Sequence, residues 1–251
     1  MAHGYRTLQQ WNQWLDHQFL GQYLLQTEQN ALNTLLKQHY GKHSLLIGVP
    51  SQYRLLENTN LPCHWLITPV IDSEKKISYV EGDLKDLPFL TGSLDVVILP
   101  HTLEFINHPR QLLAEACRVI KPEGLIVICG FNPYSLWGIH KLMTSSKTPP
   151  WSSNFIQAQK IKHWLRLADF IMEDKKTTLF RPPIKQKSLF NKIDFMEKMG
   201  QICFPIFGGV YILVARAKVI PLTPIKMKWK QQLSGIRIST SISGHIARRA
   251  K

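Results

Sequence analysis

A histidine and a glutamate follow an apolar run near the middle of the chain, and both side chains could exchange protons with a bound molecule. Residues 96–99 form the run, and Pro100, His101 and Glu104 come after it. The ordinary pKa of a histidine lies near neutrality, so His101 could act as a general base or orient a substrate. It could instead be a histidine in a cleft wall that bonds only to backbone, and Glu104 could belong to the start of a helix.

Other candidate residues also come at the ends of predicted strands. Gly48, Asp83 and Pro100 each close such a strand. The carboxyl ends of parallel strands meet at one edge of a sheet, and ligands bind outside that edge. These independent loops therefore predict a pocket there. Asn132 and Tyr134 follow a later strand and are candidates for the wall of the pocket on the side of the substrate.

The apolar patterns that must position these residues predict alternating strands and helices. Residues 44–48, 96–99 and 125–129 are short apolar runs, typical of strands that are buried on both faces. Residues 109–120 carry an apolar stripe at helical spacing, begin with a proline and are stopped by a proline and a glycine. A strand, a helix and a second buried strand form a βαβ unit, which predicts a doubly wound α/β fold.

The flanking segments predict further elements on both sides of this unit. Residues 5–39 have helical spacing and predict two helices that break at Gly21 and form an N-terminal helical cap over residues 1–42. Trp137 should belong to a loop or lid. The later patterns predict that lid, a helix, a strand, a second helix and a last strand over residues 141–153, 156–168, 170–180, 185–199 and 211–215.

The composition is typical of a soluble globular protein. The chain has 251 residues, of which 44% are hydrophobic and 19% are charged. No run approaches the roughly eighteen apolar residues of a membrane span, and the N-terminus lacks the apolar core of a secretory signal. The four cysteines have no metal-ligand spacing and predict buried, reduced thiols, as expected for a cytoplasmic protein without a metal site.

The formal net charge is +14, and much of the basic excess lies near the C-terminus. No acidic residue follows Glu197, whereas ten lysines and arginines do. Residues 219–251 therefore predict a basic, flexible tail. It could bind RNA or another anionic surface through phosphate contacts and stacking by Trp229, or it could simply be solvated.

Several motifs, in this order, resemble one known family. They are Glu81-Gly82-Asp83, Leu87-Pro88-Phe89, Ser93-Leu94-Asp95 and Arg118-Val119-Ile120-Lys121-Pro122-Glu123-Gly124. Residues 43–133 resemble the class I S-adenosylmethionine (SAM)-dependent methyltransferases of the type 11 group. Residues 101–105 and 130–138 are similar to an uncharacterised bacterial branch of methyltransferase-like proteins.

The resemblance implies a Rossmann-like domain over residues 43–218. Its mostly parallel, seven-stranded sheet would carry helices on both faces and receive the last strand in antiparallel orientation. SAM would be the cofactor, and the methyl acceptor would be a small molecule or a macromolecule that the motifs do not identify. The family also has helices at the position of residues 1–42, where they pack on the sheet and help to close the cofactor cleft.

The resemblance also assigns roles to individual residues. The Asp83 carboxylate would accept a hydrogen bond from the adenine amino group, and the backbone N–H of Leu84 would meet the adenine ring. The implied cofactor-binding residues are Gly48, Asp83, Leu84, Pro100 and His101. Methyl transfer mainly requires an aligned nucleophile in a dry site, so the catalytic residue stays unknown, with His101, Asn132 and Tyr134 as candidates.

Two loops depart from the family pattern. The family has a glycine-rich loop with a leading acid after the first strand, where this chain has only Gly48 and no acid. The second strand ends near Thr68 without the acid that would bind the ribose. The alternative function is therefore a non-catalytic binding module, which could bind RNA through the tail. A nicotinamide-dependent oxidoreductase is disfavoured because G-x-G-x-x-G is absent.

Overall fold

The computed structural model describes residues 2–219, apart from residues 40, 58, 62–63, 71–78, 82–83, 85, 145, 147 and 185. Asp83 and residues 220–251, which form the predicted tail except for its first residue, lie outside the described residues.

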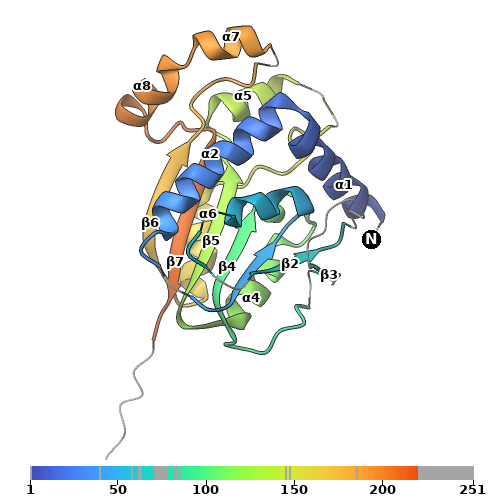
Figure 1. Ribbon diagram of the computed structural model, residues 1–251, viewed down its shortest axis with the longest axis vertical. Coiled ribbons are helices and arrows are strands. Elements are labelled where there is room, and N and C mark those ends of the chain that lie inside the picture. Colours follow the sequence, from blue (N-terminus) through green and yellow to red (C-terminus); the bar gives the residue numbers. More distant parts are fainter. Residues whose placement is uncertain are drawn as a thin grey trace, which may run out of the picture. The chain divides into compact units, whose positions relative to one another are not determined.

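The centre of the molecule is a seven-stranded sheet in the order β3-β2-β1-β4-β5-β7-β6. The strands are β1 (Ser44–Ile47), β2 (His64–Thr68), β3 (Tyr79–Glu81), β4 (Leu94–Pro100), β5 (Ile120–Phe131), β6 (Phe170–Thr178) and β7 (Val210–Ala217). The first five strands are parallel, and β7 runs antiparallel to both β5 and β6. The strand order reverses direction at β1 and β4, so the prediction of a doubly wound, mostly parallel α/β sheet is confirmed (Figure 1).

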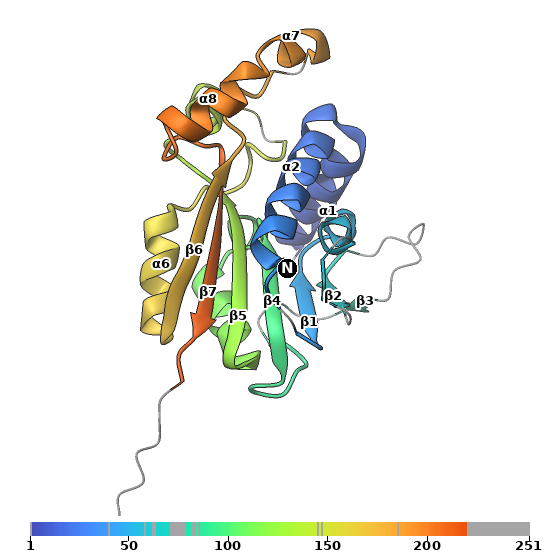
Figure 2. The same ribbon diagram turned by 60° about the vertical axis from the view of Figure 1, so that its left-hand side comes forward.

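Helices cover both faces of the sheet (Figures 1 and 2). The helices are α1 (Ala2–His17), α2 (Phe19–Leu36), the 3₁₀ helix η1 (Pro50–Leu56), α3 (Thr102–Phe105), α4 (Pro109–Val119), α5 (Leu136–Met143), α6 (Ala158–Leu167), α7 (Lys187–Lys192) and α8 (Phe195–Cys203). Successive strand residues point to opposite faces, so Leu46 and Ile98 pack with α1 and α2, whereas Ile47 and Val97 pack with α4 and α6. The sheet therefore separates two cores.

The N-terminal cap consists of two helices, but they meet at a different residue from the predicted one. Gln18 has extended backbone and separates α1 from α2, whereas Gly21 lies inside α2. A Cβ atom on Gly21 would come within 2.4 Å of the carbonyl oxygen of Trp14. Gly21 therefore allows the two helices to approach closely. The predicted break between the helices at Gly21 was wrong, because the break lies at Gln18.

The predicted lid begins as a helix. Ser135 accepts a hydrogen bond from the backbone N–H of Gly138 and caps α5. Trp137 is fully buried, and its indole N–H donates to the carbonyl of Arg181 at 2.9 Å. The loop prediction was therefore wrong for Trp137 and for residues 141–143, which belong to α5. The predicted helix over 185–199 is also divided into α7 and α8.

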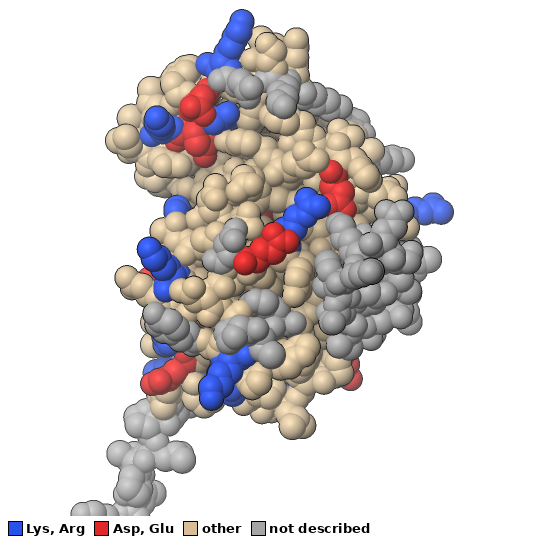
Figure 3. Space-filling model, in the orientation of Figure 1, with Lys and Arg blue, Asp and Glu red and all other residues tan. Residues whose placement is uncertain are grey.

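The structure bears on three expectations from the composition, which concern membrane spans, basic charge and cysteines. No helix in the described part of the chain is long and apolar enough to cross a membrane. Basic side chains are dispersed over the face that Figure 3 shows. Cys129 is buried as predicted, but Cys203 is exposed because α8 buries none of its residues.

Candidate functional site

Gln52 joins the ends of β1 and β4 at the carboxyl edge of the sheet. Its side-chain oxygen accepts from the backbone N–H of Val49 at 3.0 Å, and its amide nitrogen donates to the carbonyl of Pro100 at 2.8 Å. Pro50 starts the turn of η1 that carries Gln52 back over the strand end. A Cβ atom on Gly48 would lie 2.4 Å from the Gln52 oxygen. The carboxamide therefore occupies the space directly over Gly48.

His101 follows Pro100, whose carbonyl accepts from this carboxamide, and is completely buried. Its backbone is left-handed, with φ of 58°, at the turn between β4 and α3. Nε2 lies 2.5 Å from a carboxylate oxygen of Glu28, and Nδ1 lies 2.9 Å from one of Glu104. The other oxygen of Glu104 accepts from the backbone N–H of Phe131 at 2.6 Å. We call Glu28, His101 and Glu104 the buried ion cluster.

The charges of the cluster follow from burial and pairing. Burial alone would lower the pKa of His101, but the carboxylates of Glu28 and Glu104 outweigh it and raise the pKa to about 10. Burial also raises the pKa of Glu104, although the imidazolium partly opposes this. Both ring nitrogens of His101 are engaged, so in this arrangement the ring holds a proton and offers no free base.

The N-terminal helices hold the same edge through further hydrogen bonds. The Ser51 backbone N–H donates to the side chain of Asn12 at 2.9 Å, and the Ser51 hydroxyl donates to Asp16 at 2.6 Å. Glu28 belongs to α2, so that helix is held to the end of β4 by the buried ion cluster. α1 and α2 therefore form part of the site, as well as cover for the sheet.

The remaining predicted cofactor residues have mixed surroundings. Leu84 is 8% exposed and packs in the core beneath β1 and β4. The Thr68 hydroxyl bonds to the backbone of Val70, accepting from its N–H at 3.0 Å, and is not directed to a ribose site. Asp83 lies outside the described residues, so the structure brings together Gly48, Pro100 and His101 from the predicted set.

Asn132 and Tyr134 occupy the next strand end. The Asn132 amide donates to the carbonyls of Ile206 and Gly208 at 2.7 and 3.1 Å, and its oxygen accepts from the N–H of Tyr134. Tyr134 is 60% exposed and accepts a hydrogen bond from Gln157. Asn132 therefore fixes a neighbouring loop in this structure, while Tyr134 lies at the surface.

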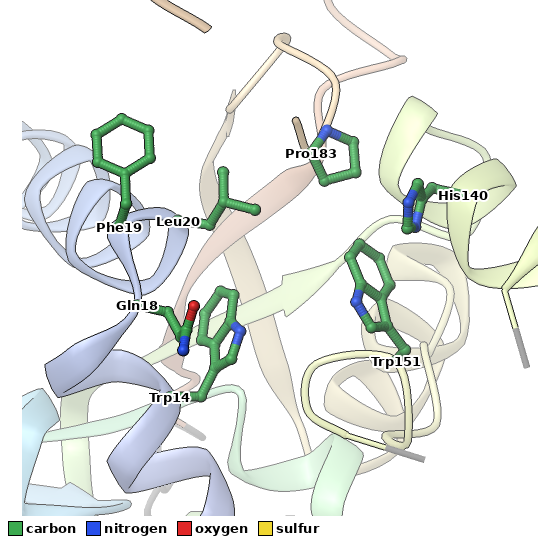
Figure 4. Close-up of a pocket in the computed structure, with 7 residues that line it drawn as sticks. All are labelled: Trp14, Gln18, Phe19, Leu20, His140, Trp151 and Pro183. Carbon is green, nitrogen blue, oxygen red and sulfur yellow. The ribbon is translucent and has the colours of Figure 1, made fainter. Parts of the chain in front are cut away.

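A cavity of about 250 Å³ opens beside the N-terminal helices α1 and α2 (Figure 4). The indoles of Trp14 and Trp151 stand on opposite sides of it, with Pro183 beyond them. Its lining comes from α1, α2, α5 and two loops: Trp14, Gln18, Phe19, Leu20, His140, Trp151 and Pro183. The walls are thus mainly aromatic and apolar, with two polar side chains.

Aromatic contacts connect both walls of this cavity to His101. On one side, Trp14 stacks on Trp11 with ring centroids 5.2 Å apart, and Trp11 lies 5.6 Å from His101. On the other side, Trp151 contacts Trp137 with ring centroids 5.6 Å apart, and Trp137 stacks on Phe131 at 5.7 Å. The Phe131 ring in turn lies 4.2 Å from the ring of His101. The cavity and the strand end therefore belong to one packed region.

Sequence reasoning missed Glu28 and Gln52. Glu28 had a signal, because it falls on the apolar stripe of α2, four residues after Leu24 and four before Leu32. A lone acid on a core-facing stripe requires a buried partner. Among the described residues, no group of three or more His, Cys, Asp or Glu side chains is arranged to hold a metal ion.

Comparisons with known proteins match this chain to one family and to several relatives. The family described as "Methyltransferase domain" matches residues 67–128. YafS, an uncharacterised protein of Escherichia coli (strain K12), is 30% identical over 214 residues, which cover 83% of this chain and 82% of that protein. A demethylmenaquinone methyltransferase of Clavibacter sepedonicus is 32% identical over 117 residues, or 39% of this chain and 48% of that protein.

A solved structure shares the fold. The crystal structure of a SAM-dependent methyltransferase from Thermotoga maritima, a possible histamine N-methyltransferase, superposes with a TM-score of 0.58 at 18% identity. The superposition covers 84% of this chain and 100% of that one. At this identity the likeness concerns the architecture.

Proposed function

We propose, since this chain belongs to the class I SAM-dependent methyltransferases, that it transfers a methyl group to an acceptor bound at the carboxyl edge of its sheet. SAM, the cofactor of the family, supplies an electrophilic methyl carbon on a sulfonium. The protein's task is to align an acceptor nucleophile with that carbon and to exclude water. The packed aromatic region around His101 supports a dry site of this kind.

The observation that carries the proposal is the position of the Gln52 carboxamide. Its NH₂ group donates to Pro100 and its oxygen accepts from Val49, directly over Gly48. The amino-acid end of SAM has the same complement, because its ammonium donates and its carboxylate accepts. We infer that Gln52 stands in for this end, and that Val49, Pro100 and Gly48 would hold the cofactor once Gln52 turns away.

We expect Gln52→Ala to bind SAM about tenfold more tightly than the unmodified chain. The substitution removes two hydrogen bonds that compete with the ligand, each contributing about 0.5–1.5 kcal/mol, and a tenfold change in affinity is about 1.4 kcal/mol. Isothermal titration calorimetry measures both affinities. Gln26→Ala is the control, because Gln26 is exposed on α2 and its side chain bonds to Gln29 and Asn30 of the same helix. A folded Gln52→Ala variant with unchanged affinity would contradict the proposed site.

A non-catalytic binding module is the second candidate function, and the same residues favour it. Gln52 is 1% exposed and His101 is fully buried, so the chain's own side chains fill part of the edge. Absence of SAM binding at about 1 mM by both the unmodified chain and Gln52→Ala would support this candidate.

We further propose that the acceptor is a flat aromatic or conjugated ring system. A cavity of about 150 Å³ can hold benzene, so the 250 Å³ between Trp14 and Trp151 suits two fused rings. Aromatic walls favour planar ligands, because stacked rings gain interaction energy beyond simple burial. Gln18 and His140 can hydrogen-bond one polar substituent of such a ring.

Trp14→Leu is expected to weaken the binding of 2-naphthol about fivefold. Loss of one stacking partner costs about 1 kcal/mol, and the cavity is otherwise preserved. Equilibrium dialysis measures the affinity without SAM, so this test is independent of cofactor binding. Trp164→Leu is a matched control, because Trp164 is also half-buried but packs in the core on the other face. If Trp14→Leu and Trp164→Leu bound 2-naphthol equally well, the aromatic pocket would be refuted. It would also be refuted if the unmodified chain bound the saturated analogue decahydro-2-naphthol as tightly as 2-naphthol.

A further inference from the structure

Helix α8 exposes its apolar side chains. Phe195, Met199 and Ile202 recur at helical spacing and lie on one face. Their side chains are 51–82% exposed, and none of the residues of α8 is buried. A surface helix ordinarily turns such a stripe toward the core, whereas α8 turns its apolar stripe toward solvent.

Polar and close backbone contacts fix this orientation. The carboxylate of Glu197 accepts from the backbone N–H groups of Leu179 and Phe180 at 2.9 and 3.0 Å. A Cβ atom on Gly200 would lie 2.5 Å from the Phe180 ring, so only glycine allows the helix to approach so closely. The inner face of α8 is thus polar and small, while its outer face is apolar.

The apolar surface continues beyond the helix. Phe204, Ile206 and Phe207 are each more than half exposed. Asn132 holds this loop to the end of β5 through the carbonyl of Ile206. We call the whole set the α8 face: Phe195, Met199, Ile202, Phe204, Ile206 and Phe207. Apolar side chains that gather on an exposed surface in this way mark a site of interaction with a protein or a membrane.

The charges around the α8 face favour an anionic partner. The acids of this segment, Asp194 and Glu197, both lie against Arg181. Lys192 and Lys198 are exposed and form no ion pair with other described residues. Figure 3 shows uncharged side chains at this upper end, with a small group of charged ones among them. The whole chain carries +14, so a second copy would be repelled and an anionic surface attracted.

We propose that the α8 face docks on the surface of an anionic lipid bilayer. Interfacial helices insert phenylalanine and aliphatic side chains just below the headgroups, while lysines contact anionic lipids. The α8 face has these components, and its rigid attachment to the body presents them outward. This inference concerns an interaction surface and does not depend on methyl transfer.

Flotation of the full chain with vesicles tests the proposal. We expect binding to vesicles of phosphatidylglycerol and phosphatidylcholine in equal parts, and little binding to pure phosphatidylcholine. The double variant Met199→Gln/Ile202→Gln should bind roughly tenfold more weakly, because two exposed apolar side chains no longer insert. Leu90→Gln is the matched control, since Leu90 is 81% exposed, compared with 82% for Ile202, and precedes β4 at the opposite edge of the sheet.

The other outcomes discriminate among alternative partners. Equal binding by the double variant and the unmodified chain would overturn the proposal and assign vesicle binding to other basic segments. A dimer in solution that the double variant abolishes, without any flotation, would overturn it in favour of a second copy of the chain. The charge-reversal variant Lys192→Glu/Lys198→Glu provides a further check: it should bind anionic vesicles more weakly, while its thermal stability stays unchanged.

Discussion

His101→Asn is expected to lower the free energy of unfolding by about 3–5 kcal/mol, because it removes one partner of a buried charged pair. Without the imidazolium, the carboxylates of Glu28 and Glu104 stay buried and face each other with no cation between them. Asparagine is the appropriate replacement because it tolerates the left-handed backbone at this position, where φ is 58°. The loss then reports the ring and its charge, with little backbone strain.

Urea unfolding followed by far-ultraviolet circular dichroism measures this change. His163→Asn is the control, since His163 is exposed on α6 and its replacement should change stability by no more than about 0.5 kcal/mol. Adding Glu28→Gln to His101→Asn should recover part of the loss, because one uncompensated carboxylate is neutralised. A loss below about 1 kcal/mol for His101→Asn would show that the cluster is not an ionised, buried group.

The buried ion cluster connects helix α2 to the ends of strands β4 and β5. Glu28 belongs to α2, His101 to the end of β4, and Glu104 reaches the backbone of β5 through Phe131. Three segments distant in sequence therefore share one proton and two carboxylates. Replacing such a cluster by apolar residues is often neutral for stability, so we assign it a positioning role: it fixes the N-terminal helices over the carboxyl edge.

The sheet could be predicted from the sequence because its signals are local. Runs such as residues 96–99 and 125–129 are buried on both faces, and continuous apolar runs indicate this. The antiparallel orientation of the last strand, β7, was expected only from the family resemblance. Gly21 misled the prediction of the helix break because a glycine can serve either a turn or a close contact, and only the packing partner distinguishes them.

The candidate site was less predictable, because its main contacts depend on where side chains turn after the strands end. Gln52 gives no periodic signal, and its position over Gly48 follows from the 3₁₀ turn of η1. The burial of His101 likewise depends on α2, a helix that begins more than eighty residues earlier in the chain. The structure places the ends of β1 and β4 side by side, as the strand patterns predicted, but the patterns could not indicate which side chains fill the edge.

Alkaline pH should destabilise the protein through the same cluster. The pKa of His101 is raised from 6.5 to about 10 in the folded state, so the folded chain keeps a proton that the unfolded chain releases. The stabilisation is complete below pH 6.5 and is lost as the pH rises through about 10. Burial also raises the pKa of Glu104, so its contribution has the same sign, but that contribution begins at acid pH because the ordinary value is 4.5.

The predicted slope can be measured where few other groups interfere. Burial also raises the pKa values of Cys129 and Tyr211, but their ordinary values are 9.0 and 10.0, so both matter only at higher pH. From about pH 7 to about pH 8.5, the unfolding free energy should fall by about 1.4 kcal/mol per pH unit, the limit for one proton, or about 2 kcal/mol in total. Urea unfolding at several pH values should give this slope for the unmodified chain and a nearly flat profile for His101→Asn. The same slope in both proteins would mean that another group binds the proton and that His101 is neutral in the folded state.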